Sequence, residues 1–167
     1  MPIPTLLATA LATLDLAPPC HEHKPLATVE DAHAIWDNLP GAQVKNLFIK
    51  DAGRQHWLVV VPGDPRMDTK AMAPLIGSKR ISFASADDLR TILGVEPGSV
   101  TPLAMMNDQN HQVRLVIHAA LMQAETLLVH PMVNTATLAM PPADLLRFLA
   151  HHDVIPSLVD LKPAFLS

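Results

Sequence analysis

The sequence predicts an α/β (α+β) protein in which helices surround a mixed, mostly antiparallel sheet or partly closed barrel. Two observations support this fold class. Segments with strand periodicity and segments with helix periodicity follow one another without strict alternation, which argues against a regular series of β-α-β units. Apolar residues make up 49% and charged residues 17% of the 167 residues, so the chain can bury one substantial core. We therefore expect residues 1–167 to form a single domain.

Two helices are expected in the N-terminal part of the chain. Leucine and alanine recur on one side of residues 5–14, the pattern of an amphipathic helix, and a proline pair ends it. A short extended piece follows at residues 20–23. Thr28 and Asp31 then have the spacing of a capping box, which predicts a second helix that ends near residues 38–41.

The next segments predict a hairpin and two more helices. Residues 42–50 and 56–61 are apolar strand candidates on either side of a turn that contains Gly53. Capping residues at the start and glycine at the end place helices over residues 68–76 and 85–94.

The C-terminal part is expected to complete the sheet. A proline in the first turn predicts a helix over residues 142–151. The other strand candidates are short apolar or β-branched segments, at residues 81–83, 103–106, 113–117, 126–129, 135–140 and 154–161.

Charge excludes some classes of nucleic-acid-binding protein. The formal net charge is −4, whereas a protein that coats long nucleic acid needs a clustered basic surface. Lys79 and Arg80 are adjacent, and Lys45, Lys50 and Arg54 are near one another in the sequence. These few basic residues are enough for an enzyme that contacts only the end of a tRNA acceptor stem. Because there is no extended basic surface, we expect no DNA binding.

The single cysteine, Cys20, cannot form an internal disulfide, which indicates a reducing compartment. The N-terminal segment lacks the basic residues of a signal peptide, and no apolar run has the length of a membrane span. We expect a cytoplasmic protein that has no membrane partner.

Lys45 is the first candidate functional residue. Alternation along its strand places Lys45 with Leu47 and Ile49 on one face, and Asn46 with Phe48 on the other. Because both faces are largely apolar, both are expected to be covered. The lysine then either extends to solvent at the strand end or points into a pocket, where its ammonium group can hold a phosphate or polarise an ester carbonyl.

His130 and the loop after it are the second candidate. His130 ends a buried strand and precedes Pro131, and polar side chains at such ends often line sites. A histidine that is hydrogen-bonded within the structure fits this position equally well. Asn134 and Thr135 either stabilise their own turn or bind a ligand.

The segment rich in glycine and proline at residues 94–102 is the third candidate. It has neither of the glycine patterns of nucleotide-binding loops. Gly98 and Ser99 can present backbone N–H groups to an oxyanion or a phosphate, and a plain turn is the alternative.

We expect no metal and no cofactor. Potential ligands cluster at residues 20–23 and 151–152, but no second cluster at a recognised spacing completes a zinc site. The sequence also lacks the nucleophile elbow of a serine hydrolase, and the adjacent side chains of Cys20 and His21 point apart in a strand.

Four motifs resemble, in order, those of the YbaK/ProX family, the free-standing relatives of the editing domain of bacterial prolyl-tRNA synthetases. The similarity extends from about residue 23 to residue 160. The motifs are His23-Lys24-Pro25-Leu26-Ala27-Thr28-Val29-Glu30-Asp31-Ala32, Val44-Lys45-Asn46-Leu47-Phe48-Ile49-Lys50-Asp51, Leu93-Gly94-Val95-Glu96-Pro97-Gly98-Ser99-Val100-Thr101-Pro102, and His130-Pro131 with Asn134-Thr135-Ala136-Thr137. The second and fourth motifs look most like the ProXp-ala (PrdX) branch.

The resemblance implies an aminoacyl-tRNA deacylase that hydrolyses the ester of a misacylated tRNA, in that branch Ala-tRNA(Pro). It implies Lys45, Asn46 and His130 as the catalytic set, no metal, and a ribose hydroxyl of the tRNA that helps to place the attacking water. The implied partners are the acceptor end of the misacylated tRNA and, as a candidate, prolyl-tRNA synthetase. The expected substrate-binding residues are Thr28, Gly98, Ser99, Val100, Pro131, Asn134 and Thr135.

Some positions depart from the family pattern. Lys24 stands where the family usually has proline, Leu26 and Ala27 replace Val-Phe, and Leu103 to Met105 replace Phe-Gly-Leu. If these positions line the amino-acid pocket, they change its size. The amino acid that is removed from the tRNA could then be cysteine, serine or threonine in place of alanine. An alternative of another class is a non-catalytic module that binds tRNA or a synthetase.

Overall fold

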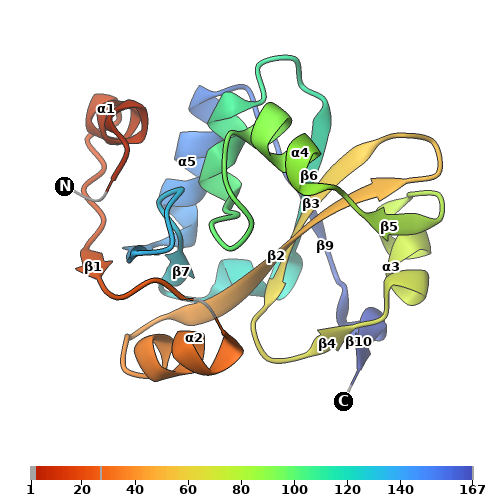
Figure 1. Ribbon diagram of the computed structural model, residues 1–167, viewed down its shortest axis with the longest axis horizontal. Coiled ribbons are helices and arrows are strands. Elements are labelled where there is room, and N and C mark those ends of the chain that lie inside the picture. Colours follow the sequence, from red (N-terminus) through yellow and green to blue (C-terminus); the bar gives the residue numbers. More distant parts are fainter. Residues whose placement is uncertain (1–2, 27, 167) are drawn as a thin grey trace.

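The computed structural model describes residues 3–26 and 28–166. Its α-helices are α1 (Thr5–Thr13), α2 (Val29–Trp36), α3 (Thr69–Ile76), α4 (Ala86–Asp88) and α5 (Pro142–His151). Its other helical segments are the π-helix η1 (Leu89–Leu93) and the 3₁₀ helices η2 (Pro102–Asn107), η3 (Ala119–Gln123) and η4 (Lys162–Ala164). Its strands are β1 (Cys20–Glu22), β2 (Ala42–Asp51), β3 (His56–Pro62), β4 (Arg66–Met67), β5 (Ile81–Phe83), β6 (Val113–His118), β7 (Leu127–Val129), β8 (Ala136–Met140), β9 (Ser157–Val159) and β10 (Phe165–Leu166). The hairpin of β2 and β3 crosses the middle of the molecule (Figure 1).

Most strands belong to one mixed sheet. Its order is β1-β8-β7-β2-β3-β6-β9, and β5 joins it along the C-terminal part of β2. β2 pairs in parallel with β7, and β6 pairs in parallel with β3 and β9, whereas the other pairs of this sheet are antiparallel. Strands β4 and β10 form a separate antiparallel pair. The predicted fold class, an α/β (α+β) protein with a mixed, mostly antiparallel sheet and surrounding helices, is confirmed.

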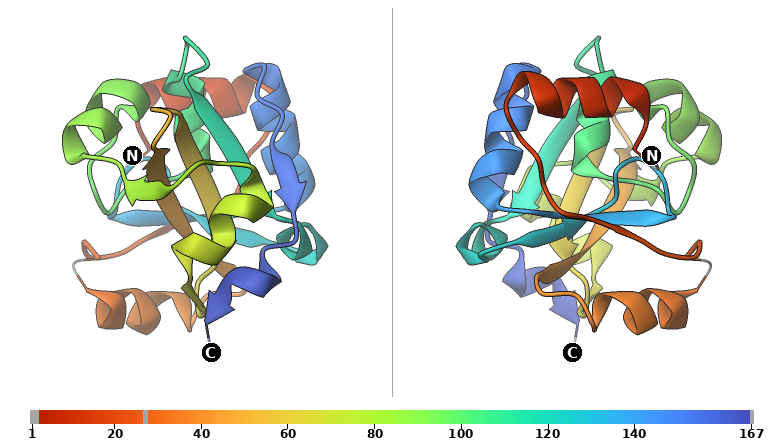
Figure 2. Two further views of the ribbon diagram at one scale, coloured as in Figure 1. Left: turned by 90° about the vertical axis from the view of Figure 1, so that its right-hand side faces the viewer. Right: turned by 90° about the vertical axis from the view of Figure 1, so that its left-hand side faces the viewer.

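Apolar side chains cover both faces of the central strands. The larger cluster gathers residues of α1, α5, η1 and η2 on one face, and Phe48 of β2 belongs to it. The smaller cluster combines Ile49 of β2 and Met72 of α3 with residues near the C-terminus on the other face. Figure 2 shows helices on both sides of these strands, with α1 and α2 at opposite ends of the molecule. β2 is therefore covered on both faces, as its two apolar faces predict.

The sequence signals at several helix ends are confirmed. Thr28 forms a capping box with Asp31 at the start of α2, and Asp68 accepts hydrogen bonds from two backbone N–H groups at the start of α3. Gly77 and Gly94 end their helices with positive φ angles of 80° and 67°, which glycine adopts without a steric penalty because it has no Cβ. In the part of the chain that is described, no helix has the length and apolar character needed to cross a membrane.

The prediction of a strand at residues 103–106 is wrong, because this segment forms the 3₁₀ helix η2. The side chain of Thr101 accepts a hydrogen bond from the backbone N–H of Leu103 (3.3 Å), and Pro102 occupies the first turn. A threonine cap followed by proline is a helix-start signal, and it overrides the apolar run here. The expected strand at residues 154–161 is shortened to β9, and the two-residue strands β4 and β10 are too short to leave a periodic pattern.

The outer edge of β2 is only partly paired. β7 pairs with Ala42 and Gln43, and β5 pairs with Ile49 to Asp51. Among the described residues, no strand pairs with residues 44–48 on this side, although β3 pairs with all of them on the other side. The sheet therefore has an opening along the middle of β2.

Asp51 holds the closed end of the β2–β3 hairpin. Its Oδ1 accepts hydrogen bonds from the backbone N–H groups of Gly53 (2.9 Å) and Gln55 (3.1 Å). Its Oδ2 accepts hydrogen bonds from the backbone N–H of Lys79 (3.1 Å) and from Trp57 Nε1 (3.4 Å). Burial alone raises the pKa of Asp51, but these hydrogen bonds outweigh it and hold the pKa below the ordinary value. The carboxylate thus connects the hairpin to the segment that leads into β5.

We predict that Asp51→Asn lowers the free energy of unfolding at pH 7 by about 2–3 kcal/mol, because hydrogen bonds to a charged acceptor are lost or weakened. The folded-state pKa of Asp51 lies below its ordinary value of 3.8, so this contribution is complete above pH 3.8 and is lost as the pH falls through the folded-state pKa. Urea unfolding followed by circular dichroism should therefore show a difference between the two proteins that shrinks at acidic pH. A difference independent of pH would contradict this account.

Candidate active site at the open edge of strand β2

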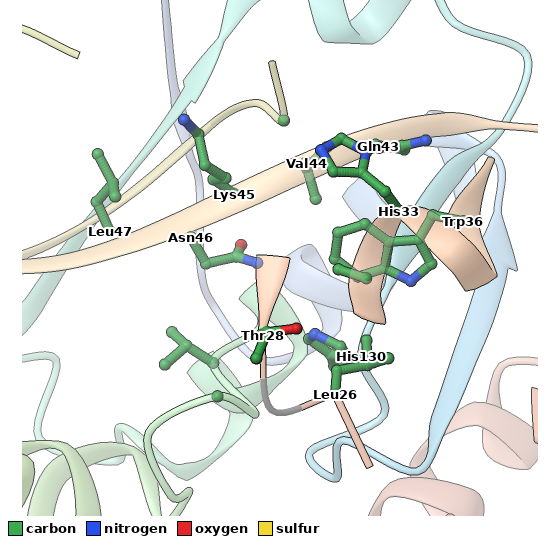
Figure 3. Close-up of a pocket in the computed structure, with 14 residues that line it drawn as sticks. Leu26, Thr28, His33, Trp36, Gln43, Val44, Lys45, Asn46, Leu47 and His130 are labelled. Atoms are coloured by element: carbon green, nitrogen blue, oxygen red, sulfur yellow. The ribbon is translucent and has the colours of Figure 1, made fainter. Parts of the chain in front are cut away.

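A cavity of about 410 Å³ lies at the opening in the edge of β2. Its size is within the range of about 300–1,000 Å³ that is usual for small-molecule sites. Helix α2, strand β2, the loop before η2 and the end of β7 supply its wall (Figure 3). The lining residues are Leu26, Thr28, Ala32, His33, Trp36, Gln43, Val44, Lys45, Asn46, Leu47, Gly63, Gly98, Val100 and His130.

The backbone of β2 contributes polar groups to this cavity. The N–H of Gly63 donates to the carbonyl of Gln43 (2.9 Å), so the odd-numbered residues of β2 direct their backbone groups toward β3. The even-numbered residues direct theirs to the opposite edge, where the carbonyl of Phe48 accepts a hydrogen bond from the N–H of Ala84 (3.1 Å). Asn46 lies midway along the opening, so its backbone N–H and C=O face the cavity.

Lys45 leaves β2 on the side opposite to Asn46 (Figure 3). Its Nζ donates a hydrogen bond to the backbone carbonyl of Pro65. Burial lowers the pKa of Lys45, the carboxylate of Asp64 opposes this shift, and the charge of Arg66 adds to it. An ammonium group has three donors, so one bond to a carbonyl leaves capacity for an anionic ligand. Lys45 is half-buried and lines the cavity, and its ammonium group lies against the carbonyl of Pro65.

Two acceptor atoms next to the cavity lack partners. Asn46 Oδ1 and His130 Nδ1 are both buried, and within residues 3–26 and 28–166 neither has a hydrogen-bond partner. A buried polar atom without a partner costs about 1–3 kcal/mol, which makes such atoms rare outside functional sites. Both residues line the cavity, so a ligand that brings N–H or O–H donors would recover this free energy.

Burial disfavours the charged form of the His130 imidazole. Its residue is 7% exposed, and the ring of Trp36 packs against it with a centroid distance of 5.5 Å. Burial lowers the pKa of His130, a backbone hydrogen bond with Ala136 opposes this shift, and the charge of His23 adds to it. Nδ1 has no partner among the described residues. In the tautomer that carries its proton on Nε2, Nδ1 has a free lone pair and acts as an acceptor.

The structure brings together six of the ten residues expected at the site and places the other four behind or beside it. Thr28, Lys45, Asn46, Gly98, Val100 and His130 line the cavity. Ser99 and Pro131 are buried and do not line it, and the carbonyl of Thr135 accepts a hydrogen bond from the N–H of His23 (2.9 Å). Asn134 lies beside Gly98, since its Nδ2 is 4.0 Å from the position that a Cβ on Gly98 would take.

Helix α2 supplies wall residues that the sequence did not indicate. Trp36, His33 and Ala32 lie on this helix, and Gln43 lies just after it at the start of β2. An amphipathic helix of this kind usually faces a core, so its periodicity does not distinguish a pocket wall from ordinary packing. The one available signal is Trp36, a large aromatic side chain in a chain that has only two tryptophans.

The departures from the family pattern do not all reach the cavity. Leu26 lines it, whereas Lys24 is exposed and does not line it. Leu103 to Met105 are almost fully buried in the larger apolar cluster and are absent from the cavity wall. The condition under which these three residues would alter the amino-acid pocket, namely that they line it, is therefore not met in this cavity. Ala27 lies outside the described residues.

Comparison with known proteins places these motifs in a family. Residues 23–148 match the model of the aminoacyl-tRNA editing domain. The chain is 39% identical over 125 residues to the prolyl-tRNA editing protein ProX of Acetoanaerobium sticklandii, covering 74% of this chain and 76% of that protein. It is 36% identical over 156 residues to the prolyl-tRNA synthetase associated domain-containing protein 1 of Xenopus laevis, covering 89% of this chain and 92% of that protein.

Solved structures support the fold. A crystal structure described as a candidate trans-editing enzyme for prolyl-tRNA synthetase superimposes with a TM-score of 0.68 at 19% identity, covering 92% of this chain and 93% of that one. A hypothetical protein superimposes with a TM-score of 0.71 at 23% identity, covering 92% of this chain and 97% of that one. At these identities the likeness concerns the fold alone.

We predict that the imidazole of His130 titrates below its ordinary pKa of 6.5, because burial penalises the charged form. Trp36→Ala admits water to the ring and should raise the pKa of His130 toward 6.5. Both values can be read from the ring signals in a nuclear magnetic resonance titration, with His130→Gln identifying the resonance. A wild-type pKa at or above 6.5 would mean that the ring is not desolvated as the structure indicates.

Proposed function

Because the chain belongs to the aminoacyl-tRNA editing domain family, the YbaK/ProX family that its motifs resemble, it is an aminoacyl-tRNA deacylase, and we propose that it removes alanine from tRNA(Pro) in trans. Relatives named for prolyl-tRNA editing, or for association with prolyl-tRNA synthetase, support tRNA(Pro) as the carrier. The misacylated acceptor end is its substrate, and we propose prolyl-tRNA synthetase, the source of such errors, as a protein partner.

The polarity of the cavity carries this proposal. A half-buried cation, Lys45, lies on one side of β2, while the unpartnered acceptors of Asn46 and His130 lie at the other end of the same cavity. The aminoacylated terminal nucleotide of a tRNA has the complementary arrangement, with an anionic 5′-phosphate at one end and an α-amino group at the other. Leu26, Trp36 and the other apolar lining residues suit a small side chain such as the methyl group of alanine.

This arrangement suggests a role for each side chain. Lys45 anchors the terminal nucleotide through its phosphate, where a point charge with several donors is effective. Asn46 Oδ1 and His130 Nδ1 accept hydrogen bonds from the α-amino group and so orient the ester. The backbone N–H of Asn46, which faces the cavity, donates to the oxyanion that develops on the ester carbonyl.

The reaction itself needs a positioned water more than an acidic or basic side chain. The water oxygen bonds to the carbonyl carbon, and the C–O bond to the ribose then breaks. The ribose oxygen takes up a proton and the amino acid leaves as a carboxylic acid. In the mechanism that we propose, the neighbouring ribose hydroxyl places the water, while the protein supplies orientation and electrostatic stabilisation.

We predict that the purified protein hydrolyses alanyl-tRNA(Pro) and that Lys45→Ala lowers kcat/KM by about 10- to 100-fold, because hydrogen bonds to charged groups contribute about 1.5–3 kcal/mol. The measurement is loss of the radiolabelled aminoacyl ester at neutral pH. Lys70→Ala is the matched control, since Lys70 is an exposed lysine of α3 that does not line the cavity.

The other outcomes of this assay are equally informative. Faster hydrolysis of seryl-, threonyl- or cysteinyl-tRNA than of the alanyl ester would transfer the assignment to that amino acid. Binding of tRNA without hydrolysis of any ester, unaffected by Lys45→Ala, would mean that this chain is a non-catalytic module.

The α-amino contact has its own test. Lactyl-tRNA(Pro) carries a hydroxyl in place of the amino group at nearly the same size, and a single hydroxyl proton can satisfy one of the two acceptors but not both. We predict that kcat/KM for the lactyl ester, corrected for its uncatalysed hydrolysis, is about tenfold lower than for the alanyl ester. Equal corrected values would remove Asn46 and His130 from recognition of the amino group.

A further inference from the structure

Thr137 occupies a fully buried position behind the wall of the cavity. It lies in β8, where its exposed fraction is 0%. Leu128 pairs with Ala139 across β7 and β8, so the same register places Thr137 opposite His130. Residues directly opposite each other on paired strands share a face, so Thr137 and His130 point to the same side of the sheet. This side is opposite to that of Leu138, which belongs to the larger core cluster.

The hydroxyl of Thr137 joins two side chains from distant parts of the chain. Trp36 Nε1, at the end of α2, donates a hydrogen bond to Thr137 Oγ1 (3.1 Å). His23 Nε2 lies 2.8 Å from the same oxygen, and His23 Nδ1 lies 2.8 Å from the backbone carbonyl of Lys24. A hydroxyl has one proton and two lone pairs, so it can serve both neighbours only if the directions of the bonds agree.

These directions agree when one nitrogen of the His23 ring carries the proton and the other carries a lone pair. A carbonyl only accepts, so His23 Nδ1 carries the proton that it donates to Lys24. His23 Nε2 is then an acceptor, and the hydroxyl of Thr137 donates to it. The oxygen of Thr137 remains free to accept from Trp36. The result is a directed chain from Trp36 through Thr137 and His23 to the backbone of the loop that precedes α2.

We infer that Thr137 is a positioning residue that sets the amino-acid selectivity of the site through Trp36. The chain of hydrogen bonds ties both the loop before α2 and the last residue of α2 to one atom of the sheet. Trp36 in turn packs on His130, so the hydroxyl fixes the separation between this wall and the imidazole. Loss of the hydroxyl leaves the partly buried Trp36 N–H and His23 Nε2 without this partner and releases the indole from its orientation.

This inference rests on the proposed deacylase function only for its kinetic consequence. Lys45 lies across β2 and takes no part in the hydrogen bonds that join Trp36, Thr137 and His23. Anchoring of the nucleotide should therefore be unaffected. Without the Thr137 hydroxyl, the ester should be oriented less precisely, because the Trp36 side chain that packs on His130 is no longer fixed by its hydrogen bond. The expected signature is therefore a fall in kcat with little change in KM, together with weaker discrimination between alanyl and larger esters.

The test compares Thr137→Val, which keeps the shape and removes the hydroxyl, with Thr137→Ser, which keeps the hydroxyl. For Thr137→Val we expect kcat on alanyl-tRNA(Pro) to fall about tenfold, KM to stay within about twofold, and the preference for alanyl over seryl ester to decrease. Thr137→Ser should restore most of kcat. Thr126→Val is the matched control, because Thr126 precedes β7 and its hydroxyl makes none of the side-chain hydrogen bonds found among the described residues.

A second measurement on the free proteins does not depend on activity. The indole N–H of Trp36, identified with Trp36→Phe, should shift upfield and exchange faster with water in Thr137→Val but not in Thr137→Ser. The indole N–H of Trp57, which donates to Asp51, should stay in place in both variants and thus report that the fold is intact. If the wild type hydrolyses no ester, the proposed function fails while this measurement still tests the anchoring of Trp36.

Three results would overturn the inference. One is an unchanged Trp36 resonance in Thr137→Val, and another is Thr137→Ser behaving like Thr137→Val, which would assign the effect to packing of the methyl group. The third is a shifted Trp36 resonance with wild-type kcat and selectivity, which would confine the hydrogen bonds to a structural role.

Discussion

The incomplete pairing of strand β2 is the constraint on which the site depends. β2 is the only strand of the described chain that two different strands, β7 and β5, pair with along one edge, and they leave its middle uncovered between them. Because the faces of β2 are packed on both sides, the opening cannot close by collapse of the strand. The opening is therefore a rigid feature, and it exposes the backbone of Asn46 to a ligand without any movement of the sheet.

The same strand explains why a cation and two acceptors can share one cavity. Successive side chains of β2 point to opposite faces, so Lys45 and Asn46 lie at the two sides of a cavity that wraps over the strand edge. Separation by the strand keeps the ammonium group away from the place proposed for the substrate amino group. A site built on a strand also holds these groups more rigidly than a loop would.

Helix α2 closes the cavity although it is short and lies at one end of the molecule (Figure 2). A helix of eight residues is marginal by itself, so its stability must come from its ends and its contacts. The capping box of Thr28 and Asp31 satisfies backbone groups at its start. Trp36, its last residue, donates a hydrogen bond to Thr137 and packs on His130. The position of the wall thus depends on a few identifiable interactions.

The sequence by itself determined the order of most elements and the chemistry of the candidate site. Capping residues, glycines and strand alternation are local signals, so α2, α3, the β2–β3 hairpin and the placement of Lys45 and Asn46 on opposite faces of β2 could be predicted from them. The four motifs pointed to one family because their order and residue types are specific. The segment at residues 103–106 shows the limit of apolar periodicity, since a threonine cap decided its conformation.

Only the tertiary structure decided which residues face the ligand. Ser99 and Pro131 belong to motifs yet lie outside the cavity wall, whereas Trp36 carries no motif and forms part of that wall. Such differences arise from strand pairing and helix packing between segments about one hundred residues apart, as in the bond from Trp36 to Thr137. Local sequence patterns do not indicate these contacts, because strand register and side-chain packing depend on the whole core.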